Sequence, residues 1–410
     1  MAAEQHRVVD TSCCIAGGGP AGMMLGYLLA RAGVPVLVLE KHPDFLRDFR
    51  GDTIHPSTLE VMHELGLLSE FLKLPHQEVR QMNGRIGGVE LPMADFSHLP
   101  TQCKFIALMP QWDFLDFLAG QARRLPCFSL ELGAEAVSLS RDGGTVTGLV
   151  AQTAQGPLQV RCKLVVAADG RHSTLRQAAG LEGIQLGAPI DVLWLRLPRG
   201  DGDPEQTQGL MDAGRIVVML NRGDYWQCAY VIPKGGNEQV RALGLQAFRD
   251  SLAEVAPHLR QRVGALRSWD EVKLLTVAVD RLRQWSLPGL LCIGDAAHAM
   301  SPIGGVGVNL AIQDAVAAAN VLAAPLLDDS LTADDLRAVQ ERREWPTRMT
   351  QRLQLLIQNR VIGPVLENRK RPAPPAVLRL MMRWAPLRRI PARLLGLGFR
   401  PEHVRLPGAR

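Results

Sequence analysis

Gly17-Gly18-Gly19-Pro20-Ala21-Gly22 is the stretch that decides the fold of this chain. It lies between an apolar run, Thr11 to Ala16, and a segment with helical periodicity, Ala21 to Ala32. This is the G-x-G-x-x-G fingerprint in the strand, turn and helix context that it requires. The sequence therefore predicts a Rossmann-like unit that binds an adenine dinucleotide.

The spacing of the fingerprint has a chemical reason. Gly17 allows the tight turn, Gly19 lets the backbone approach a pyrophosphate, and Gly22 lets the helix pack closely on the strand. Glu40 closes the next apolar run, where its carboxylate can accept hydrogen bonds from ribose hydroxyls. A glycine-rich turn with a surface glutamate is the alternative, but strand, turn, helix and acid all agree with the dinucleotide site. We expect dinucleotide contacts from Gly17, Gly19, Pro20, Ala21, Gly22, Glu40 and Lys41.

Composition is that of a globular enzyme. The chain has 410 residues, 47% of them hydrophobic and 21% charged, which suffices for two or three domains. Its seven cysteines form no C-x-x-C pair and have no histidine at metal spacing, so we expect reduced thiols and no metal site. The N-terminus lacks a basic region followed by an apolar one, and no charge-free apolar stretch reaches about 20 residues. We therefore expect a cytoplasmic protein.

The basic residues gather near the C-terminus. Residues 369–410 hold eleven lysines and arginines against Glu402 alone, within a chain of net charge +5. Residues 377–384 and 390–399 mix apolar residues with arginines at helical spacing. Such helices could pack on the rest of the protein with solvated arginines, or make weak peripheral contact with an anionic inner-membrane surface. We expect no nucleic-acid partner, because the run has few aromatics and no known fold signature.

Two further segments indicate which dinucleotide is bound. One is Asp169-Gly170-Arg171-His172-Ser173-Thr174-Leu175-Arg176, which follows an apolar run. The other is Gly294-Asp295-Ala296-Ala297-His298, followed by residues 302–309 and by Gln313-Asp314-Ala315. With the fingerprint, these resemble the three ordered motifs of the FAD-dependent class A flavoprotein monooxygenases, the para-hydroxybenzoate hydroxylase family.

The resemblance implies an α/β fold. It consists of a Rossmann-like FAD-binding domain of the GR2 type, an inserted, mainly antiparallel β-sheet substrate domain, and C-terminal helices. Alternating apolar residues between 186 and 283 agree with such a sheet. We expect a discontinuous FAD-binding domain of residues 1–80, 101–185 and 285–345, a substrate domain of residues 81–100 and 186–284, and a basic helical region of residues 346–410.

The third motif implies contacts with the flavin. Asp295 would accept hydrogen bonds from the ribityl hydroxyls, and a helix beginning near Gly307 would stabilise anionic reduced flavin by about 1 kcal/mol or more. Pro302 would lie beside the reactive C4a edge and act through shape, with Gly304 and Gly305. The implied catalytic residues are Pro302, Gly304 and Gly305, and the implied flavin contacts are Asp295, Gly305, Gly307, Val308 and Asn309.

The other motifs imply further cofactor contacts. Asp169 and Gly170 resemble residues that touch both FAD and the nicotinamide donor. Arg50 resembles an arginine that contacts the FAD diphosphate, and Gln111 resembles a glutamine that contacts the ribityl-phosphate region. Arg171 and Arg176 could bind anions or be solvated charges. His172 and His298 could act as acid or base, although histidines held by backbone hydrogen bonds are the favoured interpretation.

The implied reaction uses FAD, NADH or NADPH, and O2. Reduced flavin would form a C4a-hydroperoxide that hydroxylates an electron-rich carbon of an aromatic or lipophilic substrate. Only one fingerprint is present, so the nicotinamide would dock transiently. The chain ends soon after the third motif, so we expect it to lack the C-terminal thioredoxin-like domain of larger phenol hydroxylases. The sequence leaves the oligomeric state open.

The chain departs from para-hydroxybenzoate hydroxylase where substrate would bind. Its only tyrosines are Tyr27, Tyr225 and Tyr230, so a tyrosine that deprotonates phenol cannot be assumed. A flavin halogenase is an alternative, since Trp226 and Ile232-Pro233 match part of the W-x-W-x-I-P motif, but Tyr230 stands where tryptophan is expected. A flavoprotein that binds a ligand without turnover is another. An apolar substrate pocket, or else plain core, is expected from Trp194, Met211, Met219, Trp226 and Tyr230.

Overall fold

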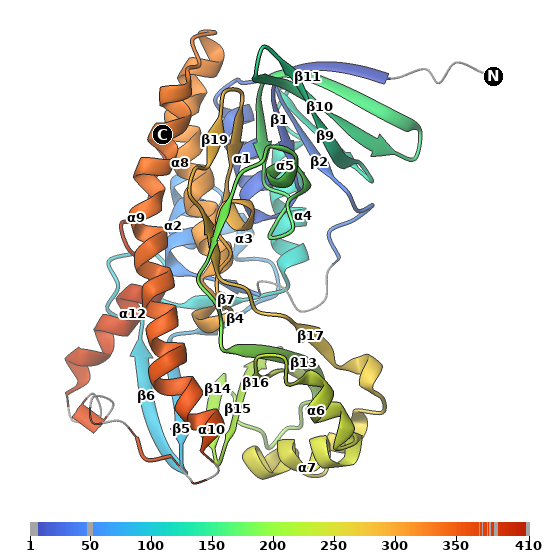
Figure 1. The fold of residues 1–410 in the computed structure, drawn as a ribbon. Helices are drawn as coiled ribbons and strands as arrows, with labels where there is room; N and C mark the ends of the chain where they lie inside the picture. The colour runs from blue at the N-terminus through green and yellow to red at the C-terminus, as the bar shows by residue number, and fades with distance from the viewer. Residues whose placement is uncertain are drawn as a thin grey trace.

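Two large sheets covered by helices form most of the protein, together with a three-stranded sheet, β3-β7-β4, and a two-stranded one, β12-β18 (Figure 1). The computed structural model describes residues 7–46, 52–368, 370, 372–374, 376, 379–380 and 384–406. The upper sheet in Figure 1 is mixed and contains the glycine fingerprint, and the lower sheet is almost entirely antiparallel. The predicted α/β class is confirmed.

The upper sheet is built around β1 (Arg7–Ala16), which ends at the fingerprint. β1 pairs in parallel with β2 (Val36–Glu40) on one side and with β11 (Gly156–Ala167) on the other. The order continues through β8 (Phe128–Leu132) beyond β2, and through β20 (Leu290–Cys292) and the antiparallel β19 (Ser286–Leu287) beyond β11. Because the central strands are parallel, their carboxyl ends meet at one edge, where ligands of such sheets bind.

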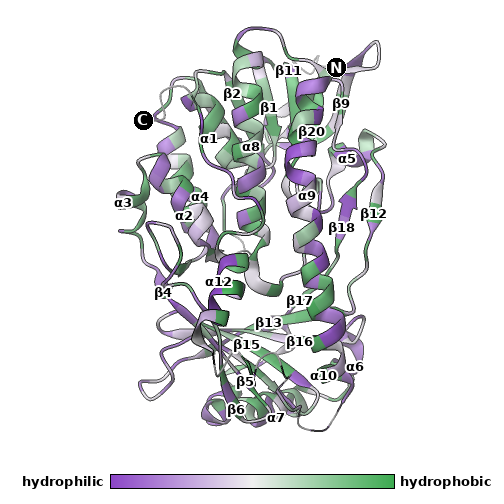
Figure 2. Cartoon of the chain, turned by 90° about the vertical axis from the view of Figure 1, so that its left-hand side faces the viewer, coloured by the Kyte–Doolittle hydropathy of each residue, from purple (hydrophilic) through white to green (hydrophobic). Residues whose placement is uncertain are grey.

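Helices cover this sheet and bury its apolar strands. α1 (Pro20–Arg31) packs against α8 (Gly307–Leu327) and α4 (Gln111–Ala122). Figure 2 shows α8 largely in hydrophobic colours. By length and composition the segment Ile303–Leu327 could cross a membrane, but 72% of its apolar window is buried, as in the core helix of a soluble protein. α9 (Ala333–Ile357), which begins at a Thr332–Asp335 capping box, runs from the upper sheet down to the lower one (Figure 1).

The lower sheet joins strands from two distant parts of the chain. Its order is β17 (Lys273–Leu275), β13 (Ile190–Pro198), β16 (Tyr225–Pro233), β15 (Arg215–Asn221), β14 (Gln208–Asp212), β5 (Gln81–Ile86) and β6 (Val89–Asp95). Only the β14–β5 pair is parallel. The sheet thus includes segments from the predicted substrate domain, whose boundaries stay a prediction.

The two faces of the lower sheet meet different partners. One face, the α7 face, packs its apolar residues against α7 (Leu245–Val255), and α6 (Asn237–Ala242) lies beside it. The opposite face, the loop face, packs against Ile303 and against α9 and α10 (Gly363–Glu367). The loop face is therefore turned toward the third sequence motif.

Shorter elements complete the molecule. α12 (Arg389–Gly396), in the basic region, packs on β6. Among the described residues, the other α-helices and strands are β3 (Thr53–Ile54), α2 (Pro56–Glu64), α3 (Leu68–Phe71), β4 (Gln77–Val79), β7 (Ile106–Leu108), β9 (Glu135–Asp142), β10 (Thr145–Thr153), α5 (Thr174–Ala178), β12 (Gly183–Gln185) and β18 (Asp280–Leu282).

Candidate active site

The fingerprint turn has the geometry that a pyrophosphate needs. Gly17 has φ +109°, and a Cβ there would clash with the carbonyl of Ala168. A Cβ on Gly22 would clash with the Gly17 carbonyl, so close packing of α1 also requires glycine. A Cβ on Gly19 meets nothing within 4 Å, so the backbone is open on that side. With Pro20 at its first turn, α1 directs free N–H groups to this space, which fits an FAD pyrophosphate.

Glu40 is fixed at the carboxyl end of β2. Its Oε2 accepts the Gly18 N–H at 2.9 Å and its Oε1 accepts the His42 N–H at 3.1 Å. The residue is only 9% exposed, whereas Lys41 is exposed. Carboxylate oxygens have further lone pairs, so Glu40 can also accept from a ribose hydroxyl.

Asp169 follows β11 at the same edge. Its Oδ2 accepts the Leu175 N–H at 3.3 Å, and its Oδ1 is buried without a hydrogen-bond partner among the described residues. Burial raises the pKa of this carboxyl. Gly170, with φ +84°, makes the turn that only glycine adopts readily. An unpaired buried acceptor beside the fingerprint fits a site that a cofactor hydroxyl or amide completes.

The second and third motifs are connected by arginines. Arg171 Nη2 lies 3.8 Å from Asp295 Oδ2. Arg176 donates to the Ala296 carbonyl at 3.3 Å and forms an ion pair with Asp280 at 3.7 Å. Both arginines therefore hold protein groups, while His172 is exposed.

A buried charge network locks the turn that presents Asp295. Asp314 accepts the Gly294 N–H at 3.1 Å, His298 Nε2–H at 2.6 Å and Arg343 Nε–H at 2.9 Å. Asp314, His298 and Arg343 are each at most 1% exposed. His298 Nδ1 has no partner among the described residues, so His298 is best described as a positioning group. The sequence singled out neither Asp314 nor Arg343 for this function.

The 302–307 loop leads into α8 and is held in place by Thr53. After Pro302, Gly304 and Gly305 have φ +77° and +63°, and a Cβ on Gly305 would clash with Thr53. The hydroxyl of Thr53 donates to the Gly305 carbonyl at 2.9 Å. Gly307 begins α8, so the positive N-terminal end of this helix adjoins the loop.

Asn309 holds this loop rather than pointing to a free ligand. Its Oδ1 accepts the His55 N–H at 2.8 Å and the Thr58 hydroxyl at 2.7 Å, and its Nδ2 donates to the Thr53 and Gly305 carbonyls. Val308, next to it, is buried. Asn309 therefore has its side chain committed to protein groups, and a direct flavin contact from it stays a prediction.

His55, which sequence reasoning missed, connects the loop to α12. Its Nδ1–H donates to the Leu395 carbonyl at 2.7 Å. Leu395 lies against Gly304, since a Cβ built there would come within 3.2 Å of it. Burial lowers the pKa of His55 to about 4. No local sequence signal links a histidine to a helix 340 residues later.

A second polar cluster, also missed, joins the start of α4 to the lower sheet. Buried Asp52 forms an ion pair with Arg222 at 2.7 Å and accepts Gln227 Nε2–H at 2.6 Å. Gln111 begins α4 beside it, and its backbone interacts with the Asp52 carboxylate. Burial raises the pKa of Asp52. Arg50, two residues earlier, lies outside the described residues.

The five residues predicted to line a substrate pocket fall on both faces of the lower sheet. Trp194 and Met211 pack on the loop face with Ile303. Met219, Trp226 and Tyr230 belong to the α7 face. There Tyr230 bonds to the Ser251 hydroxyl at 2.7 Å and Trp226 donates to Asp203 at 2.8 Å. The structure does not bring the five together, and the alternative of plain core describes the last three.

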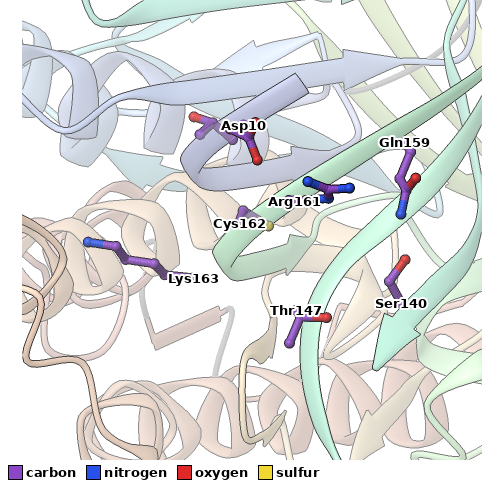
Figure 3. A pocket seen from close by; sticks show the side chains of 8 residues that line it. Asp10, Ser140, Thr147, Gln159, Arg161, Cys162 and Lys163 are labelled. Carbon is purple, nitrogen blue, oxygen red and sulfur yellow. The ribbon is translucent and has the colours of Figure 1, made fainter. Parts of the chain in front are cut away.

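A surface cavity lies elsewhere. It measures about 390 Å³ and is lined by polar side chains from β1, β9, β10 and β11, including Asp10, Arg161 and Lys163 (Figure 3). Asp10 pairs with Arg161 in the first halves of β1 and β11, far from their carboxyl ends. This cavity is therefore separate from the residues that the three motifs bring together.

Comparison with known proteins agrees with this arrangement. Residues 10–353 match the family model described as FAD binding domain. The 6-methylpretetramide 4-monooxygenase of Streptomyces rimosus is 33% identical over 351 residues, which cover 84% of this chain and 83% of that protein. The rifampicin monooxygenase of Streptomyces venezuelae is 29% identical over 73% of this chain, which spans only 61% of that relative.

Solved structures share the fold. An anhydrotetracycline hydroxylase from Streptomyces rimosus superposes with a TM-score of 0.72 at 23% identity, covering 95% of this chain and 76% of that one. The flavin-dependent brominase Bmp2 superposes with a TM-score of 0.75 at 19% identity, covering 95% and 94%. At these identities the likeness concerns the fold alone. From the family match and the first relative, this chain belongs to the FAD binding domain family and is an FAD-dependent class A flavoprotein monooxygenase.

Proposed function

We propose that this protein is a single-component hydroxylase that uses NADH or NADPH and O2 to hydroxylate an aromatic or polycyclic, lipophilic substrate. The observation that carries the proposal is the position of the 302–307 loop, which lies between the dinucleotide site and the loop face of the lower sheet. Relatives named for tetracycline-type and nitrophenol substrates support an aromatic substrate.

The loop face offers a surface for a flat apolar ring. Trp194, Ala229 and Val218 are direct cross-strand neighbours, so their side chains share this face. Gly209 continues the row opposite Val218, and a Cβ on Gly209 meets nothing within 4 Å. A row of small residues next to a tryptophan suits the face of a flat ring. Residues 81–100 and 186–284 are accordingly our proposal for the substrate domain.

Each group around this space has a defined task. FAD, when bound, supplies the redox and oxygen chemistry. Pro302 and the two glycines after it keep the loop narrow and close to the backbone, while Asn309 and Thr53 prevent it from moving. The N-terminus of α8 favours negative charge above the loop. Ile303, Trp194 and Val218 exclude water from the side where the substrate ring would lie.

The test is anaerobic stopped-flow reduction of the FAD-loaded protein. NADH and NADPH are each mixed with enzyme in the presence and absence of phenols, quinone precursors and polycyclic aromatics. We expect one donor to reduce the flavin, and one compound class to accelerate that reduction. Failure of both donors under every condition would contradict the proposal.

The same experiment addresses the two alternatives. A halogenase receives reduced flavin from a separate reductase, so neither donor would reduce the bound flavin. Against a halogenase, Tyr230 lies on the α7 face, away from the 302–307 loop, and bonds to Ser251. Donor oxidation that rises with a ligand would exclude a flavoprotein that only binds ligands.

A further inference from the structure

Arg222 is a buried cation whose Nη1 has no hydrogen-bond acceptor among the described residues. It lies just after β15, and its side chain is 4% exposed. Its Nε–H donates to Gln227 Oε1 at 3.0 Å, and its Nη2 lies 2.7 Å from Asp52 Oδ2. Nη1 is buried and has no hydrogen-bond partner among the described residues, and Nη2 meets Asp52 as an ion pair without hydrogen-bond geometry. A buried guanidinium N–H without an acceptor is unfavourable, so this position calls for an oxygen from a ligand.

The free end of Arg222 faces a narrow pocket whose side chains close it to a water-sized molecule, so a ligand oxygen would have to part them. The pocket is lined by Asp52, Pro110, Trp112, Arg196, Arg222, Tyr225 and Gln227. It lies between the start of α4, where Gln111 approaches Asp52, and the end of the lower sheet nearest the β15–β16 turn. Arg222 thus faces the junction between the dinucleotide half of the molecule and the lower sheet.

This pocket is the polar end of the loop face. Gln227 is two residues before Ala229 on β16, so the two side chains lie on the same face, about 7 Å apart along the strand. Ala229 belongs to the row with Trp194 and Val218. A ring held over that row therefore has apolar neighbours along its length and the guanidinium of Arg222 at its edge.

The charge at this end favours an anion. Arg196, whose guanidinium lies 5.3 Å from the Tyr225 ring, is a second arginine in the lining, and among the described residues that line the pocket Asp52 is the one acid. Arginine is also the side chain best suited to holding an oxyanion in a partly buried site.

We propose that Arg222 binds the oxyanion of the substrate through Nη1, and that the substrate is a phenol or enol acidic enough to ionise near neutral pH. Such an acid has its hydroxyl conjugated to a carbonyl or a similar acceptor group. The negative oxygen raises electron density on the ring carbon that is to be hydroxylated. The substrate then needs no tyrosine to deprotonate it. Tyr230 lies on the α7 face and Tyr27 in α1, while Tyr225 lines the pocket beneath the guanidinium of Arg196. This inference rests on the proposed function.

The test uses alizarin, 1,2-dihydroxyanthraquinone, as probe and the oxidised FAD-loaded protein. The alizarin anion absorbs at longer wavelength than oxidised flavin, so its ionisation is read directly from the spectrum. We expect the bound dye to ionise at lower pH than the free dye. In Arg222→Lys, which keeps a positive charge for Asp52 but lacks the forked donor, affinity for the anion should fall roughly tenfold or more.

Two variants separate binding from folding. Arg215→Lys is the matched control, since Arg215 begins β15, the strand that Arg222 follows, but pairs with Glu254 of α7 at 2.7 Å. This variant should bind alizarin like the wild type. Asp52→Asn removes the competing negative charge, so anion affinity should be kept or increased. FAD content and thermal unfolding of each variant are measured in parallel. Weaker binding in both Arg222→Lys and Asp52→Asn would mean that the cluster is only structural and would overturn the proposal.

The remaining outcomes are equally decisive. No binding by the wild type, binding of the neutral dye without a shift in its ionisation, or unchanged binding in Arg222→Lys would each overturn the proposal. A shifted ionisation that depends on Arg222, in a protein whose flavin neither donor reduces, would uphold the anion site and reject the hydroxylase. If a ligand accelerates flavin reduction equally in the wild type and in Arg222→Lys, the hydroxylase would be upheld and the anion site rejected.

Discussion

His55 shows how one side chain can hold two distant parts of the site together. Its backbone N–H bonds to Asn309 and its ring to the Leu395 carbonyl, so the 302–307 loop and α12 are both fixed to the start of α2. The ring is completely buried, and burial lowers its pKa to about 4. The imidazole of His55 is therefore neutral in the folded protein at neutral pH.

This burial predicts a pH dependence of stability. In the unfolded chain His55 titrates near 6.5, so between about pH 6.5 and 4 the unfolded state binds one proton more than the folded state. The free energy of unfolding should therefore fall as pH is lowered through this window, by up to about 3 kcal/mol from this residue. Urea unfolding at pH 7 and pH 5 measures it. His55→Asn should have a smaller pH dependence, whereas His63→Asn, at the exposed end of the same helix, should keep that of the wild type.

At the scale of elements, the fingerprint was predictable because its geometry is local. Gly22 must be glycine because of the Gly17 carbonyl in the same turn, and Gly17 has φ +109°. The close approach of Gly17 to the Ala168 carbonyl, just after β11, comes from the fold and has no local signal. The arrangement of the lower sheet was harder to predict, because β16 is buried on both faces and its residues do not alternate between apolar and polar. Period two indicates that Trp226 and Tyr230 share a face, but not that this face meets α7. Asp52 and Gln227, 175 residues apart, meet only through the fold and have no local signal.

The division of faces predicts different effects for two tryptophans on paired strands. Trp226→Phe removes a buried hydrogen bond to Asp203 on the α7 face, and should lower the free energy of unfolding by about 1–3 kcal/mol with unchanged ligand response. Trp194→Phe, on the loop face, should change ligand-stimulated flavin reduction while stability changes by less than about 1 kcal/mol. Urea unfolding and stopped-flow reduction of both variants test this. If Trp226→Phe altered the ligand response and Trp194→Phe did not, the assignment of the faces would be wrong.

At the scale of the whole molecule, the basic C-terminal region is anchored and yet keeps an exposed surface. Glu402, its one acid, is 2% exposed and pairs with Arg342 at 2.6 Å and Arg343 at 3.5 Å. Through Arg343 it reaches Asp314 and the turn that presents Asp295. Of the region's described apolar residues, Leu380, Trp384 and Ile390 are more than half exposed.

The exposed part of this region predicts weak, salt-sensitive binding to anionic membranes. Arg389 and Arg393 lie in α12 with Ile390, so apolar and basic groups are presented within two turns of helix. A basic amphipathic surface of this kind gains about 1 kcal/mol per arginine near anionic lipid, and loses most of it at high salt. Sedimentation with anionic liposomes at low salt should carry down a fraction of the protein, and Ile390→Glu should reduce that fraction. Leu243→Glu, at the exposed end of α6, is the matched control and should sediment like the wild type. If the protein stays in the supernatant at low salt, α12 serves only to hold Leu395 against the 302–307 loop.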